Sequence, residues 1–158
     1  METITEKPKV NKKNLTAYWG IHVELNEVLQ IEEIKTALTS KPNLKPLQKI
    51  HSTLLYVGKK EGNANEVIFG PLENKECELS VTSFGLSDNA LCVKVTSVTY
   101  LNENNESQYM PSFATQQHIT LALNNSVKAV DSIKAFTEGN IIDIPEYKLK
   151  GHVKRYLF

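Results

Sequence analysis

The stretch Ile50-His51-Ser52-Thr53-Leu54-Leu55-Tyr56-Val57 carries a pattern that returns at His118-Ile119-Thr120-Leu121-Ala122-Leu123. Both copies read His-x-Thr-Leu among apolar residues. In an extended strand, residues two apart point to the same face, and the residues between them point to the other face. Each copy therefore places an imidazole beside a hydroxyl. If the two strands lie near each other in one sheet, two imidazoles and two hydroxyls gather at one site.

Alternation and helix-start signals predict the first half of the fold. Residues 1–14, rich in Lys, Glu and Asn, are interpreted as a flexible tail before a single domain at 15–158. A strand is predicted at 18–25, with Trp19, Ile21, Val23 and Leu25 facing the core and Tyr18, Gly20 and His22 facing the other side. A helix capped by Asn26 is predicted to run to about residue 39. The first His-x-Thr strand at 50–57 follows, and then a polar turn or loop at 59–66.

The second half is predicted to be similar. A hairpin at 78–86 and 90–98 is joined by Ser87-Asp88-Asn89, and a polar surface loop at 101–111 serves as either a lid or a connection. The second His-x-Thr strand at 117–123 precedes a helix from Asn125 or Ser126 to about residue 137. Final strands are predicted at 141–144 and 147–158. This order predicts a two-lobed (bilobal) α+β fold, in which antiparallel sheets line a central groove and helices lie outside.

Composition narrows the class of protein. The chain has 158 residues, and its 18 Lys and Arg balance its 18 Asp and Glu, so no net charge attracts long nucleic acid. A short substrate is the better interpretation. No apolar run is long enough to span a membrane, and the N-terminal residues lack the apolar segment of a signal peptide. We expect a cytoplasmic monomer with no membrane partner. Cys77 and Cys92 are expected to be reduced core thiols.

The repeated His-x-Thr motif suits phosphodiester chemistry. Cleavage needs one group that takes a proton from the attacking oxygen and another that gives a proton to the leaving oxygen, and imidazole can do both near neutral pH. Donors to the non-bridging oxygens are also needed, and each Thr hydroxyl provides one. The candidate catalytic residues are therefore His51, His118, Thr53 and Thr120.

Other chemistries have weaker support in the sequence. Neither motif has an acidic neighbour at ligand spacing, so we predict no metal site and no cofactor. The chain has no Gly-x-Ser-x-Gly motif and no Gly-rich phosphate loop. His22 shares a face with Tyr18 and is interpreted as a bystander. His152 lies among basic residues near the C-terminus and is interpreted as solvated.

These motifs resemble those of the two-histidine phosphoesterase superfamily, also called LigT-like, which is defined by a pair of His-x-Thr/Ser motifs on two strands of a bilobal sheet. Within it, residues 18–158 are most similar to the catalytic domain of the 2',3'-cyclic-nucleotide 3'-phosphodiesterases. Tyr18-Trp19-Gly20 resembles the Tyr-Phe-Gly of their opening strand, and 78–95 resembles their central hairpin. Gln116 stands where those enzymes have a basic residue.

The resemblance implies roles for individual residues. His118 would be the base and His51 the acid, or the reverse, with Thr53 and Thr120 holding the phosphate. Tyr18 and Tyr56 would be aromatic walls against a nucleobase, and Val130 would add an apolar edge. Simple alternation places Tyr56 on the core side, so this role requires a β-bulge or a strand end in the first motif.

The sequence thus predicts a metal-independent phosphodiesterase acting on a small nucleotide with a 2'-linked phosphodiester, such as 2',3'-cyclic GMP-AMP or a 2'-5' oligoadenylate. Such an activity would suit a viral protein that antagonises host nucleotide sensing. One alternative is a 2',3'-cyclic phosphodiesterase of RNA processing that acts on RNA ends and leaves a 2'-phosphate. Another is a non-catalytic nucleotide- or RNA-binding module, although binding alone would not require two proton-transfer groups.

Overall fold

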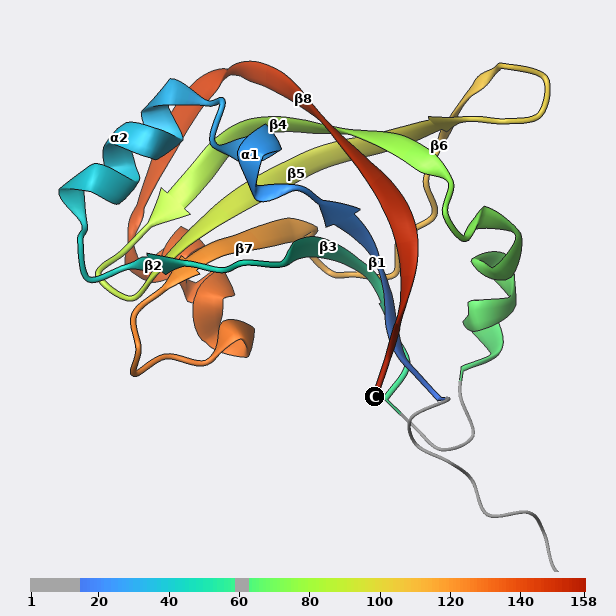
Figure 1. Ribbon diagram of the computed structural model, residues 1–158, viewed down its shortest axis with the longest axis horizontal. Coiled ribbons are helices and arrows are strands. Elements are labelled where there is room, and N and C mark those ends of the chain that lie inside the picture. Colours follow the sequence, from blue (N-terminus) through green and yellow to red (C-terminus); the bar gives the residue numbers. More distant parts are fainter. Residues whose placement is uncertain (1–14, 59–62) are drawn as a thin grey trace, which may run out of the picture.

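One antiparallel sheet dominates the computed structural model, which describes residues 15–58 and 63–158 (Figure 1). The predicted tail at 1–14 and the start of the predicted loop at 59–66 lie outside the described residues. The strands are β1 (Thr16–Val23), β2 (Lys45–Pro46), β3 (Ile50–Tyr56), β4 (Glu76–Leu86), β5 (Ala90–Leu101), β6 (Ser107–Tyr109), β7 (His118–Leu123) and β8 (Asn140–Leu157).

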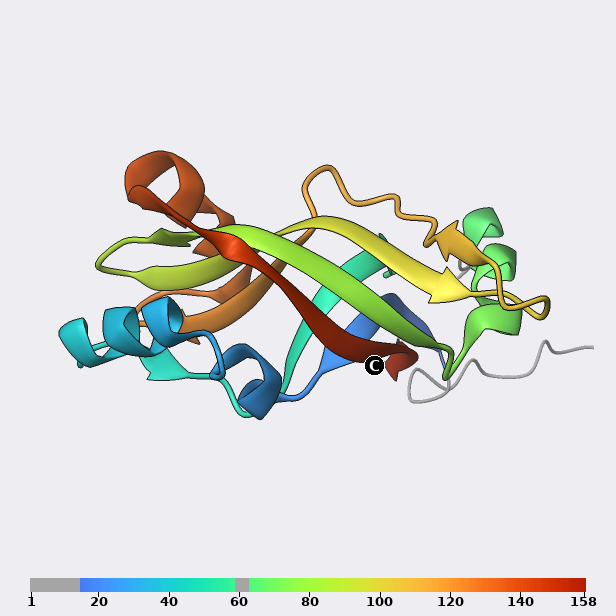
Figure 2. The same ribbon diagram turned by 90° about the horizontal axis from the view of Figure 1, so that it is seen from above.

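The sheet closes on itself. Its strand order is β2-β7-β3-β1-β8-β4-β5-β6, and a further pairing of β7 with β5 joins the ends of a six-strand barrel. The prediction of an α+β fold built on antiparallel strands is confirmed. The closure differs from the predicted pair of sheets, because one strand, β7, pairs with both β3 and β5. Long strands β8, β4 and β5 run side by side across the molecule (Figure 2).

The inward faces of the strands form one hydrophobic core. Trp19, Ile21 and Val23 of β1 are buried as predicted, while Tyr18 and His22 are only half-buried. The same alternation buries Leu149 and Val153 of β8. Burial of this apolar face stabilises the barrel by roughly 25 cal/mol per Å² of apolar surface removed from water. The opposite face of each strand does not contribute to this core and can therefore carry polar side chains.

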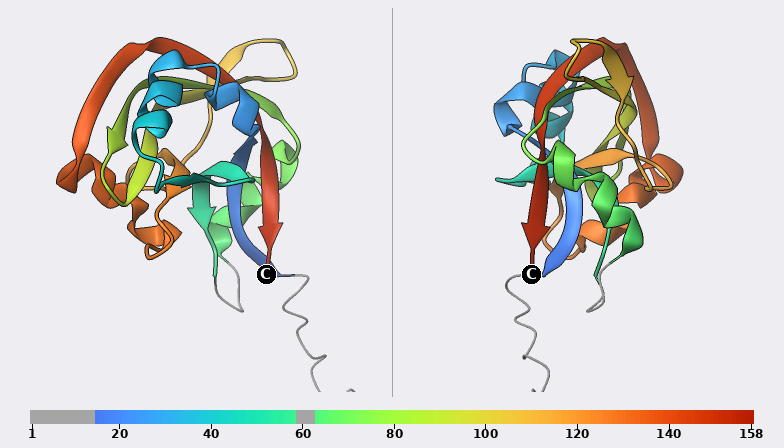
Figure 3. Two further views of the ribbon diagram at one scale, coloured as in Figure 1. Left: turned by 60° about the vertical axis from the view of Figure 1, so that its left-hand side comes forward. Right: turned by 90° about the vertical axis from the view of Figure 1, so that its right-hand side faces the viewer.

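The predicted helix at 26–39 is two helices in the structure. These are α1 (Leu25–Val28) and α2 (Glu32–Ser40), and both lie at one open end of the barrel (Figure 3). The predicted cap at Asn26 is wrong, since Asn26 lies within α1 and Glu24 precedes it. The chain turns between the helices, and this turn lets Val28, Ile31 and Ile34 all reach the core. No helix in the described ranges is long and apolar enough to span a membrane.

Other elements also differ from the predictions. The predicted loop at 101–111 contains β6, which pairs with β5. The helix predicted up to about residue 137 is the short 3₁₀ helix η4 (Ala129–Lys134) followed by α3 (Ala135–Glu138), with Lys128 at the cap position in place of Asn125 or Ser126. The two final strands are the single strand β8, since Pro145 interrupts the pairing with β4 without ending the strand. The remaining 3₁₀ helices are η2 (Ala64–Ile68) and η3 (Gly70–Leu72).

The strand ranges and the cysteines agree with the sequence analysis. The first strand, both His-x-Thr strands and the hairpin at 78–98 are confirmed to within a few residues. Cys77 and Cys92 are buried and free. Local pattern therefore predicts the strands well, whereas it misplaces helix ends and short irregular elements.

Gly151 of β8 lies directly against β1, and this contact is testable. A Cβ at Gly151 would lie 2.7 Å from the carbonyl oxygen of His22 and 2.7 Å from Cγ2 of Ile21. We expect Gly151→Ala to lower the free energy of unfolding by about 1–3 kcal/mol through overpacking. The matched control is Gly70→Ala, where a Cβ meets nothing within 4 Å. Urea denaturation checks both variants, and equal midpoints would contradict this packing.

Candidate active site

The two motif strands present their polar residues on the face turned away from the core. In β3, Ile50, Ser52 and Leu54 are buried, and in β7, Ile119 and Leu121 are buried. The residues between them are half-buried: His51, Thr53, His118 and Thr120. Alternation in each strand therefore produces the predicted pairing of imidazole and hydroxyl on one face.

Strand pairing brings the two motifs together. β3 and β7 are antiparallel neighbours with Ser52 opposite Ile119 (Figure 1). In this register, the next residues across the two strands are His51 with Thr120, and Thr53 with His118. Residues opposite each other in antiparallel strands lie close enough for their side chains to interact. Each imidazole thus lies opposite the hydroxyl of the other motif, and the two imidazoles lie diagonally. We call these four residues the His-Thr cluster.

The two imidazoles influence each other electrostatically. Burial is the main cause that lowers the pKa of His51 from 6.5 to about 4, followed by the positive charges of His118 and His22. His51 is therefore neutral at pH 7 in the free protein. Because the unfolded chain takes up a proton that folded His51 does not, this shift makes the free energy of unfolding fall as the pH drops from about 6.5 to about 4.

The ring of His118 has a fixed orientation. Its Nδ1 lies 3.0 Å from the carbonyl oxygen of Gln116. A carbonyl only accepts hydrogen bonds, so Nδ1 carries the hydrogen and Nε2 is left for proton transfer. Gln116 thus contributes to the orientation of His118 through its backbone carbonyl.

Aromatic rings lie beside His51. The ring of Tyr18 is 4.9 Å from that of His51 and stacks on Tyr156 at 4.4 Å between centroids. Gly20 makes this approach possible, since a Cβ there would lie 3.4 Å from the Tyr156 ring and 3.7 Å from the His51 ring. The amino group of Lys154 lies 5.1 Å from the centroid of Tyr156. The sequence analysis did not select Tyr156 or Lys154, although the alternation in 147–158 puts both on one face.

The other two predicted binding residues are exposed. The register of β1 with β3 shifts between Trp19 and Gly20, so that Leu54 is an extra residue in β3. This bulge is the one that the sequence analysis required, and it places Tyr56 opposite Tyr18 with 70% of its surface exposed. Val130 lies in η4 and is 78% exposed. No ring contact joins Tyr56 to Tyr18 among the described residues.

The other two histidines belong to the same row of strands. His22 is paired with His51 on one side and with His152 on the other, and the rings of His22 and His152 are 5.2 Å apart. His22 also donates to Glu24 at 3.1 Å. His152, predicted to be solvated, is half-buried instead, because β8 pairs with β1. The burial of His152 could not be predicted from the sequence, because it depends on the pairing of β8 with β1, which are far apart in the chain.

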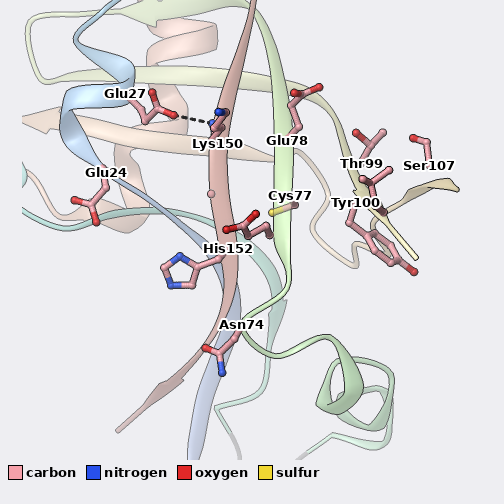
Figure 4. Close-up of a pocket in the computed structure, with 13 residues that line it drawn as sticks. Glu24, Glu27, Asn74, Cys77, Glu78, Thr99, Tyr100, Ser107, Lys150 and His152 are labelled. Carbon is pink, nitrogen blue, oxygen red and sulfur yellow. Dashed lines mark hydrogen bonds between the residues drawn. The ribbon is translucent and has the colours of Figure 1, made fainter. Parts of the chain in front are cut away.

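A cavity of about 830 Å³ lies on a different part of the outer surface (Figure 4). Four carboxylates, those of Glu24, Glu27, Glu76 and Glu78, line it together with His152. Among the described residues that line it, Lys150 is the one lysine, so the four carboxylates leave the cavity with an excess of negative charge that disfavours a phosphate anion. We therefore assign the candidate active site to the His-Thr cluster, one strand beyond His22, and not to this cavity. No group of three or more His, Cys, Asp and Glu side chains in the described ranges could hold a metal ion.

Comparison with solved structures identifies a similar fold. A crystal structure of a fungal RNA kinase matches with a TM-score of 0.53 and 16% sequence identity, over 98% of this chain and 43% of that one. At this identity the similarity establishes the fold alone. The chain thus spans less than half of that protein. No protein-family model matches the chain, and no curated protein sequence does.

The titration of His51 tests this geometry. We expect its ring signal to titrate near pH 4 by NMR. Sulfate, which keeps its charge over the relevant pH range, should raise this pKa because a nearby anion stabilises the imidazolium. By linkage, sulfate should then bind more tightly at pH 5 than at pH 7.

The control for this titration is His118→Ala. Removing the charge of His118 should raise the pKa of His51 only in part, because burial is the larger cause. An ordinary His51 pKa that is insensitive to sulfate would show that the two imidazoles do not share a site.

Proposed function

We propose that this protein is a metal-independent phosphodiesterase that cleaves a 2'-linked phosphodiester in a small nucleotide of the 2',3'-cyclic GMP-AMP or 2'-5' oligoadenylate type. The observation that carries the proposal is the His-Thr cluster, in which each imidazole lies opposite the hydroxyl of the other motif. Proton acceptor, proton donor and anion-binding hydroxyls all come from the chain, so the scheme needs no metal.

The pKa of His51 favours one assignment of roles. Two neighbouring groups whose environments separate their protonation are suited to be acid and base. Burial lowers the pKa of His51 to about 4, so its ring is neutral at pH 7 and can accept a proton, and we assign His51 as the base and His118 as the acid. This assignment is the reverse of the first one that the family resemblance implies, in which His118 is the base and His51 the acid.

The step is an in-line displacement at phosphorus. A water oxygen attacks phosphorus and gives a proton to His51, the P–O bond to the leaving ribose oxygen breaks, and that oxygen takes a proton from Nε2 of His118. The hydroxyls of Thr53 and Thr120 donate to the two non-bridging oxygens, where negative charge resides.

The aromatic residues beside His51 suit a nucleobase. Tyr18 presents a ring already stacked on Tyr156, so little side-chain entropy is lost when a base stacks against it. Exposed Tyr56, opposite Tyr18 across the bulge, supplies a second ring, and Val130 supplies an apolar edge from η4. A nucleotide would thus have its phosphate at the His-Thr cluster and its base along β1.

We also propose membership of the two-histidine phosphoesterase superfamily and a bilobal description of the barrel. Two features support this. Each half of the chain contributes one motif, and the pairing of β3 with β7 at Ser52 and Ile119 joins the two motif strands. The similarity to a fungal RNA kinase supports the broader class of nucleotide- or RNA-modifying enzymes.

The second candidate is a 2',3'-cyclic phosphodiesterase that acts on RNA ends. The likeness to an RNA kinase favours it, since that protein acts on RNA by its name. The neutral charge of this chain favours the short nucleotide. A non-catalytic nucleotide-binding module remains the alternative of another class, and the variants below test it.

A substrate panel tests the function. With EDTA present, we expect turnover of 2',3'-cyclic GMP-AMP or 2'-5' diadenylate, read by mass spectrometry, and slower turnover of 2',3'-cyclic AMP. His51→Ala and His118→Ala should each lower kcat by about 10²–10⁴-fold. His152→Ala is the matched control and should retain activity. Full activity in the double variant would point to a contaminant, and binding without turnover would identify a binding module.

A leaving-group experiment tests the roles. Adenosine 2'-(4-nitrophenyl phosphate) releases nitrophenolate, which needs no proton from an acid. We expect His118→Ala to lose less than about tenfold in rate on this ester, while His51→Ala loses about 10²–10⁴-fold on both the ester and the natural linkage. The opposite pattern would make His118 the base.

A further inference from the structure

A buried serine lies behind one of the two phosphate-binding hydroxyls. Ser132, in η4, has none of its surface exposed, and its Oγ lies 2.5 Å from Oγ1 of Thr120. η4 follows β7 and packs against it, so a residue 12 positions along the chain returns to the motif. This distance lies within the range of hydrogen bonds between hydroxyls.

A buried thiol continues this contact into the protein. Cys92 of β5 is directly opposite Thr120 of β7, is fully buried, and has its Sγ 4.0 Å from Oγ of Ser132. Burial raises the pKa of this thiol to about 12. Cys92 is therefore protonated at neutral pH and offers a weak S–H donor to Ser132.

The number of hydrogens fixes the direction of these bonds. A phosphate oxygen only accepts, so Thr120 must spend its one hydroxyl hydrogen on the substrate. The hydrogen between Thr120 and Ser132 must then belong to Ser132. Ser132 is left with lone pairs, and the thiol of Cys92 lies where it can donate to one of them. The chain of donors thus runs from Cys92, which packs with Ala90 and Ala135 beneath η4 and α3, through Ser132 and Thr120 to the phosphate.

We infer that Ser132 is a positioning residue, which holds the hydroxyl of Thr120 with its hydrogen directed at one non-bridging phosphate oxygen. This inference rests on the proposed function. Thr53 is different, because no side-chain hydrogen bond to its hydroxyl occurs among the described residues. The two non-bridging oxygens would therefore meet one hydroxyl held by Ser132 and one that has no such side-chain partner among the described residues, and preorganisation makes the first the stronger donor.

Phosphorothioates measure the two oxygens separately. The probes are the Rp and Sp phosphorothioates of 2'-5' diadenosine phosphate, each with sulfur in place of one non-bridging oxygen. Thr120→Val identifies the diastereomer whose sulfur faces Thr120. In the wild-type protein, we expect sulfur at that position to slow cleavage by about 10- to 100-fold.

Ser132→Ala should reproduce the Thr120→Val pattern. We expect Ser132→Ala to lower the cleavage rate of the unmodified substrate by about 10- to 100-fold. The ratio of the oxygen rate to the sulfur rate should fall to about 1 for the diastereomer whose sulfur faces Thr120 and should stay unchanged for the other diastereomer. Ser126→Ala, an exposed serine in the preceding turn, is the matched control and should behave as wild type. Thr53→Val should change only the other diastereomer.

The outcomes separate this inference from the proposed function. A wild-type protein that cleaves none of the unmodified substrates overturns the proposed function, and the inference with it. An active wild type with Ser132→Ala equal to Ser126→Ala overturns only the inference. The inference is also overturned if Ser132→Ala lowers the cleavage rate of the unmodified substrate and of both phosphorothioates by the same factor, because that result would mean a purely structural role for Ser132. If Ser132→Ala melts below the assay temperature, Ser132→Cys carries the test, since a weaker donor should give the same position-selective change, reduced in size.

Discussion

The pairing of β3 with β7 at Ser52 and Ile119 is the contact on which the barrel and the site both depend. Inward, it joins two buried positions and helps to close the six-strand barrel. Outward, the same register sets His51 opposite Thr120 and Thr53 opposite His118. A shift of one residue in either strand would turn its polar pair into the core. The hydrophobic core therefore enforces the geometry of the cluster, because such a shift would also expose Ile50 and Leu54 in β3, or Ile119 and Leu121 in β7.

The outer face of the barrel is divided by charge. Along β1, β3 and β7 it carries imidazoles and hydroxyls beside the aromatic rings of Tyr18 and Tyr156. Across β8 and β4 it carries the cavity lined by four glutamates. The contact of His22 with His152 marks the border between the two regions. In the function we propose, the phosphate lies at the His-Thr cluster and away from the carboxylates of the cavity. Because folded His51 is half-buried and uncharged, the free energy of unfolding falls at acid pH. A bound anion would stabilise the protonated ring and so reduce this loss of stability.

Local periodicity was a good guide to strands and a poor one to helices. Apolar alternation predicted β1, β3, β7 and the hairpin, because burial on one face acts on every second residue. The predicted helix from Asn26 is interrupted after Val28, and the turn between the two helices lets Val28, Ile31 and Ile34 all pack in the core. Likewise, η4 replaces a regular helix where Ser132 meets Thr120. In both places tertiary contacts outweigh the small energies of helix propensity.

The sequence alone determined that an imidazole and a hydroxyl share one face in each motif strand, and that Trp19, Ile21 and Val23 face the core, since both follow from the period of a strand. It also showed that Tyr56 could take the outward role implied by the family resemblance only through a β-bulge or a strand end. Tertiary structure decided that β7 lies between β3 and β5, that β8 brings Tyr156 and His152 to β1, and that Ser132 returns to Thr120. These contacts join residues far apart in the chain. They are selected by the free energy of burying the whole core at once, and a local sequence pattern does not contain that information.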